Sequence, residues 1–133
     1  MVDLLSGQMQ LYFGTMPGVM PHVKSGRLRP VAVTSEKRSQ TLPELPTIAE
    51  TGVAGYEAST WYGLHAPALT PRPIVTRLHA EVVKILAVRE MHERLVSQGF
   101  EPVGNTPEQF AAYIRAEIAK WGKVIREADI KAE

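Results

Sequence analysis

Apolar and polar positions follow different periods in the two halves of the chain. In the first half, residues 8–13 alternate polar and apolar side chains, and residues 28–34 have an apolar centre. Both patterns are typical of strands. Between them Pro17 predicts the start of a short helix and Gly26 its end. Strand, helix and strand joined by short links form a βαβ unit with parallel strands.

The second half has the periodicity of helices. Thr70 and Pro71 predict the start of a long helix that breaks near residues 87–88, and a further helix follows over residues 89–98. The capping box formed by Thr106 and Gln109 begins a last helix that should run to about residue 128. The apolar positions on one face of each long helix are Ile74, Leu78, Val82 and Ile85, widened by Val75 and Leu86, and Phe110, Ile114, Ile118, Trp121 and Ile125.

The two halves are joined by a proline-bearing segment and a further strand. Residues 35–46 are polar, which predicts a surface excursion with extended backbone before each proline. Residues 55–67 contain the β-favouring Trp61 and Tyr62, so we expect a strand where the chain crosses between two lobes. Two parallel strands alone make a poor sheet. We therefore expect the first forty residues to require strands from outside this sequence.

Composition excludes several classes of function. The chain has 133 residues, 44% of them hydrophobic and 22% charged, with a net charge of +1. This balance gives no bulk attraction to nucleic acid or to an anionic membrane. There are no cysteines, so disulfides and thiolate metal sites are excluded. No apolar run approaches the roughly 20 residues that span a bilayer, and the first residues do not resemble a signal peptide.

No residue pattern indicates catalysis. The four histidines, His22, His65, His79 and His92, lack metal-ligand spacing, and no serine lies in a nucleophile elbow. Glycine-rich phosphate loops are also absent from the sequence. We therefore expect no catalytic residues, no metal and no cofactor, and we do not expect an enzyme.

Gly14, Thr15 and Met16 form the candidate binding site. They follow the carboxyl end of a strand in a presumed parallel sheet and precede the helix that begins at Pro17. Ligands of open α/β sheets bind at such places, and the free amides at a helix start attract carboxylates. An ordinary βα turn is the alternative interpretation of the same residues.

Eight segments, taken in order and at these spacings, resemble one family. They are residues 4–8, 16–28, 32–38, 42–52, 55–57, 61–64 with 66–67, 70–74 and 102–110. The string closely resembles the C-terminal part of the Bug, or TctC-like, family, the extracytoplasmic solute receptors of tripartite tricarboxylate transporters. Each motif is weak alone, but the ordered set is specific and covers essentially the whole chain.

The resemblance implies a partial periplasmic-binding-protein fold of the α/β class, with two lobes that close on a small organic acid. Residues 1–38 would belong to the second lobe as its βαβ piece, residues 39–57 would cross between lobes, and residues 58–133 would supply the strand and helices of the first lobe. The resemblance places Gly14, Thr15 and Met16 at the ligand. Many members have an aspartate at the position of Gly14, so its absence leaves the type of ligand open.

The resemblance also implies periplasmic localisation, a carboxylate ligand and membrane transporter subunits as partners. Because the family's first half is missing from this sequence, we expect a fragment, a truncated reading frame or one half of a split receptor. Such a chain should bind carboxylates weakly or not at all by itself. The alternative function is a non-binding remnant that self-associates through unpaired strand edges.

Overall fold

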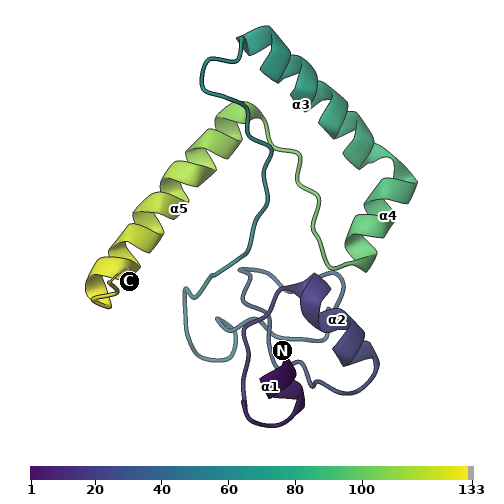
Figure 1. Ribbon diagram of the computed structural model, residues 1–133, viewed down its shortest axis with the longest axis vertical. Coiled ribbons are helices and arrows are strands. Elements are labelled where there is room, and N and C mark those ends of the chain that lie inside the picture. The colour runs from purple at the N-terminus through teal and green to yellow at the C-terminus, as the bar shows by residue number, and fades with distance from the viewer. Residues whose placement is uncertain (132–133) are drawn as a thin grey trace. The chain divides into compact units, whose positions relative to one another are not determined.

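The computed structural model describes residues 1–131, and five α-helices account for its regular structure (Figure 1). The helices are α1 (Val2–Leu5), α2 (Met16–Lys24), α3 (Arg72–Ala87), α4 (Arg89–Ser97) and α5 (Pro107–Glu127). The helices α2, α3, α4 and α5 each begin and end within two residues of a helix that the sequence predicts. Among residues 1–131, no helix combines the length and the apolar character needed to cross a membrane.

The ends of α4 and α5 follow directly from local sequence. Thr106 accepts a hydrogen bond on its side chain from the Gln109 amide at 3.2 Å, and the Gln109 side chain accepts one from the Thr106 amide at 2.9 Å. This confirms the predicted capping box at the start of α5. Gly99 ends α4 in a left-handed conformation with φ 85°, and the Phe100 amide then donates to the Leu95 carbonyl at 3.0 Å.

The chain divides into two compact units. The first comprises Met1–His65 and Val88–Pro102, and the second comprises Ala66–Ala87 and Val103–Glu133. The structure describes the second unit as far as residue 131. The two units differ in construction, because α3 and α5 belong to the second while most of the first is irregular backbone.

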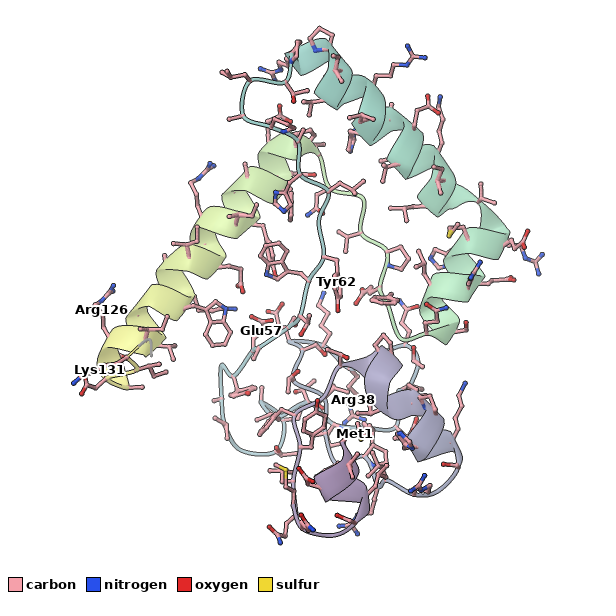
Figure 2. All side chains as sticks on the ribbon, in the orientation of Figure 1. Met1, Arg38, Glu57, Tyr62, Arg126 and Lys131 are labelled. Atoms are coloured by element: carbon pink, nitrogen blue, oxygen red, sulfur yellow. The ribbon has the colours of Figure 1, made fainter. Side chains whose placement is uncertain are left out.

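Backbone pairing near Thr47 organises the first unit. The Val33 amide donates to the Pro46 carbonyl at 2.9 Å, and the Val33 carbonyl accepts from the Ile48 amide at 3.0 Å. These bonds form a parallel bridge between Val33 and Thr47, and the Thr47 side chain is almost completely buried. Elsewhere in this unit Tyr62, labelled in Figure 2, meets the Phe100 ring edge to face with centroids 5.7 Å apart. Long-range contacts therefore hold a unit that has little regular structure.

The expected βαβ unit is not confirmed. No strand is formed within residues 1–131, and the parallel bridge there joins Val33 to Thr47 and not to residues 8–13. The segment before α2 is extended, but it leaves Leu11 and Phe13 63% and 65% exposed. A strand needs a neighbour to satisfy its backbone groups and to cover its apolar side chains. Residues 1–131 do not provide that neighbour to residues 8–13.

The second unit is built around α3 and α5. At their N-terminal ends, Arg72 and Glu108 form an exposed ion pair at 2.8 Å. Gly104, with φ 67°, lies where an added Cβ would meet Val83 and Leu86 at 3.6 Å, so the link before α5 packs against α3. These contacts place the two helices in one unit, as Figure 1 shows.

Candidate ligand-binding site

A pocket of about 200 Å³ opens in the first unit next to the start of α2. Its lining residues come from the link before α2, from the end of the Val33 segment and from the segment that follows Gly55. They are Phe13, Gly14, Thr15, Thr34, Tyr56, Ala58 and Thr60. A space of this size can take a small organic molecule.

One wall of the pocket is the turn that begins α2. Thr15 is the N-cap residue with extended backbone angles, and its carbonyl accepts hydrogen bonds from the amides of Gly18 at 3.0 Å and Val19 at 3.2 Å. Its side chain makes no capping hydrogen bond. The Thr15 hydroxyl is therefore available to a ligand, and the positive end of the α2 dipole lies beside it.

Gly14 lies in close packing at this wall. A Cβ atom at Gly14 would lie 2.5 Å from the Tyr12 ring and 2.6 Å from the Val19 side chain. Both distances are far inside van der Waals contact, so any side chain at this position must displace Tyr12 or Val19.

The opposite wall depends on a contact between distant segments. The Ala58 amide donates to the Thr34 carbonyl at 2.9 Å, which holds the two segments side by side. The Tyr56 amide donates to the Val53 carbonyl at 3.0 Å, closing the turn that contains Gly55 at φ 76°. This turn directs the chain back along Thr34, so Thr34, Tyr56 and Thr60 all line the pocket.

A reciprocal network supports the segment that pairs with Val33. The Thr47 hydroxyl accepts from the Glu50 amide at 3.1 Å, and the Glu50 carboxylate accepts from the Thr47 amide at 2.8 Å. Arg38, labelled in Figure 2, donates to both Glu50 carboxylate oxygens, at 2.9 and 3.1 Å. The hydrogen bond from the Thr47 backbone, followed by the bond from Arg38, lowers the pKa of Glu50 below its ordinary value. Glu50 therefore stays ionised and fixes the loop behind the bridge.

The pocket offers neutral hydrogen-bond donors together with apolar surface. None of its seven lining residues carries a charged side chain, while three threonines and one tyrosine supply hydroxyl groups. Phe13 and Ala58 add an apolar contact surface. Such a site can hold a carboxylate through hydroxyl and amide donors and can enclose a short carbon chain. Within residues 1–131, no group of three His, Asp or Glu side chains could hold a metal ion.

The structure places two of the three candidate residues at the pocket and one outside it. Gly14 and Thr15 line the pocket, whereas Met16 does not. Met16 instead packs against Gly99 at the end of α4, where an added Cβ would lie 2.5 Å from the Met16 Cβ. Sequence analysis did not select Thr34, although Thr34 also ends a predicted strand and so meets the criterion that selected Gly14. Tyr56, Ala58 and Thr60 enter the pocket through the pairing of residue 58 with residue 34, which no local signal indicates.

The family model for the tripartite tricarboxylate transporter family receptor, TctC, matches residues 1–130. The chain belongs to the TctC family. The members of this family are solute-binding receptors and not enzymes, and they are periplasmic binding proteins. Among curated relatives, BugT of Bordetella pertussis is 37% identical over 130 residues, which is 98% of this chain and 40% of BugT. The chain spans about two-fifths of the length of the first curated relatives that it matches.

Solved TctC-family structures share the conformation of this chain. R. palustris Rpa4515, solved with adipate, is 40% identical with a TM-score of 0.85, over 96% of this chain and 43% of that one. The periplasmic binding protein BugD is 33% identical with a TM-score of 0.84, over 99% and 45%. MatC of Rhodopseudomonas palustris, solved with bound malate, is 29% identical with a TM-score of 0.76, over 93% and 43%. The chain therefore has part of a periplasmic-binding-protein fold.

Proposed function

We propose that this chain supplies a carboxylate-binding region of an extracytoplasmic receptor that delivers a small organic acid to a tripartite tricarboxylate transporter. The pocket at the start of α2 is the observation on which the proposal rests. It joins Gly14 and Thr15 to hydroxyl groups from two other segments. Membership of the TctC family supports a binding function over catalysis.

The ligand class follows from the chemistry of the pocket. A carboxylate needs hydrogen-bond donors, and the hydroxyl groups of the threonines and the tyrosine in the pocket lining provide them without a cationic side chain. A short carbon chain needs apolar contact, and Phe13 and Ala58 provide it. Rpa4515 and MatC, solved with adipate and malate, support an aliphatic dicarboxylate as the first ligand to test.

Cellular roles follow from the same proposal. The receptor would act in the periplasm, and its macromolecular partners would be the membrane subunits of the transporter. The division into residues 1–38 of a second lobe, a crossing over residues 39–57 and residues 58–133 of a first lobe stays a prediction. Met16, which lies outside the pocket lining, would support the turn by packing against Gly99.

Thermal unfolding with and without acids tests the proposal. A ligand that binds only the folded chain raises the free energy of unfolding by about 1.4 kcal/mol at ten times its Kd. We expect adipate or malate at high concentration to raise the melting temperature of the chain. Gly14→Ala should abolish the rise, because the new methyl group displaces Tyr12 or Val19 and distorts the wall.

Gly122→Ala is the matched control for this experiment. Gly122 lies in α5, outside the pocket, and an added Cβ would make an ordinary contact at 3.5 Å with Arg126. Its response to the acid should equal that of the unmodified chain. The proposal fails if no acid shifts the melting temperature, or if Gly14→Ala and Gly122→Ala respond alike.

A further inference from the structure

An ion pair ties together the two ends of the irregular segment over residues 35–46. The Arg38 Nε atom donates to both Glu50 carboxylate oxygens, at 3.1 and 2.9 Å, although the two residues are 12 positions apart in the sequence. Their side chains are 46% and 47% exposed. Ion pairs with this exposure usually contribute little to stability, because water screens the charges. The position of this pair, behind the pocket, indicates a second role.

The Glu50 carboxylate connects Arg38 to the backbone bridge. Its Oε2 atom accepts one hydrogen bond from Arg38 at 2.9 Å and another from the Thr47 amide at 2.8 Å. Thr47 is the partner of Val33 in the parallel bridge, and it is deeply buried. Through one oxygen atom, Arg38 therefore helps to fix the residue that Val33 pairs with.

The bridge in turn holds one wall of the pocket. Val33 makes two backbone hydrogen bonds to the residues on either side of Thr47, at 2.9 and 3.0 Å. Thr34 follows Val33 directly, and its carbonyl accepts a hydrogen bond from the Ala58 amide at 2.9 Å. Thr34 and Ala58 both line the pocket. A shift of the Thr47 segment would therefore move two lining residues together.

A second ion pair in the same unit has no such connection. Arg89 and Glu93 lie one turn apart within α4, at 2.7 Å, and their side chains are 90% and 62% exposed. Neither residue lines the pocket. Both ion pairs are accessible to water, so their charges are screened in a similar way. They differ in what each carboxylate holds in place, which makes the α4 pair a suitable reference.

We propose that Arg38 and Glu50 are positioning residues for the ligand. Their ion pair keeps Thr34 and Ala58 in place, and its loss weakens carboxylate binding because that wall of the pocket loosens. Neither Arg38 nor Glu50 lines the pocket, so the effect reaches the ligand through the bridge. The inference rests on the proposed function, because it concerns the affinity of the same pocket.

The variants Arg38→Gln and Glu50→Gln test the inference, because each removes one charge and leaves a neutral polar side chain. Hydrogen exchange of the Ala58 amide, measured without any acid, reports whether the wall is held. We expect this amide to exchange faster in both variants, with little change inside α4. A general loss of stability would instead speed exchange at both places.

Titration calorimetry with adipate and malate measures the affinity of the same variants. The apparent Kd should rise about threefold if the wall is in place for about a third of the time. The variant with both substitutions should bind no more weakly than either single variant, because the first substitution already breaks the ion pair. Independent effects on stability would add instead.

Arg89→Gln and Glu93→Gln are the matched controls, since they remove the same charges from an exposed ion pair in the same unit. Both should keep the Ala58 exchange rate and the Kd of the unmodified chain.

Three results would overturn the inference. They are an unchanged Ala58 exchange rate in Arg38→Gln and Glu50→Gln, faster exchange at Ala58 with no change in Kd, and control variants that respond like the test variants. If the unmodified chain binds neither acid, the proposed function fails. Exchange of the Ala58 amide then decides by itself whether Arg38 and Glu50 hold the wall.

Discussion

Thr47 and Thr106 make the same local hydrogen bonds, but the segments that follow them adopt different structures. At Thr106 the reciprocal bonds with Gln109 measure 3.2 and 2.9 Å, and at Thr47 those with Glu50 measure 3.1 and 2.8 Å. The first pair starts α5, a helix of 21 residues. The second pair starts a single turn that ends before Gly52, which has φ 123°.

Tertiary context accounts for the difference. Beyond Thr106, apolar positions recur at helical spacing and no glycine interrupts the sequence before Gly122. The Thr47 segment is held instead by its pairing with Val33, and the Thr47 side chain is only 2% exposed. A capping box therefore specifies a first turn. The residues that follow decide whether a helix or a loop continues from it.

Replacing each threonine by alanine should give the largest difference between the two regions in the free energy of unfolding. Thr47→Ala should lower the free energy of unfolding by about 2 kcal/mol, the upper end for a lost N-cap, because water cannot replace a buried hydroxyl. Thr106→Ala should cost about 1 kcal/mol, because its cap is exposed and water competes for the Gln109 amide. Urea denaturation of both variants measures the two values.

Serine at each position is the control, because it keeps the hydroxyl and should recover most of the loss. Equal losses for the two alanine variants would contradict the comparison, since they would mean that burial and the Val33 pairing add nothing at Thr47.

A substitution just after the C-terminal end of α5 should change the free energy of unfolding by a smaller amount and in the opposite direction. Asp129 follows the helix in a left-handed conformation with φ 48°, the position that glycine usually occupies. Asp129→Gly should raise the free energy of unfolding by up to about 1 kcal/mol, because glycine adopts this conformation without steric cost. Its ion pair with Lys131 is exposed and should contribute little. A matching gain from Asp129→Ala would contradict the explanation, because alanine keeps the steric cost.

Replacing Glu50 should change the stability of the fold least, and the size of this change should depend on pH. Its pKa is lowered in the folded chain, so ionised Glu50 stabilises the fold above its ordinary value of 4.5, and this contribution is lost as the pH falls through the lowered value. Glu50→Gln keeps an acceptor for the Thr47 amide and removes only the charge. Its melting temperature should fall below that of the unmodified chain at pH 7. The two should converge in acid, and a constant gap across pH would contradict the assigned cause.

Helices could be predicted from the sequence because their signals are local. Pro17 and Thr106 lie within one residue of a helix start, Gly99 lies two residues after the end of α4, and the break at residues 87–88 separates α3 from α4 as expected. The predicted strands did not form, because a strand depends on a neighbour that periodicity cannot supply. The apolar face predicted on α3 was correct as a pattern, yet Ile74, Leu78 and Ile85 remain exposed.

The candidate site was predictable on one side only. The rule that ligands bind beyond the carboxyl ends of strands pointed to Gly14 and Thr15, and both line the pocket. The other wall depends on the hydrogen bond between Ala58 and Thr34, which are separated by more than twenty residues and linked by no sequence motif. The close approach of Tyr12 to Gly14 likewise follows from packing and not from pattern.

A residue-resolved NMR titration with adipate and malate tests the central claim, that the pocket at the start of α2 binds a carboxylate. The account predicts that the backbone amide signals of Gly14, Thr15, Thr34 and Ala58 move with added acid, and that Gly14→Ala strongly reduces the movement. Signals that stay fixed at these four residues, or that move only in α3 and α5, would contradict it.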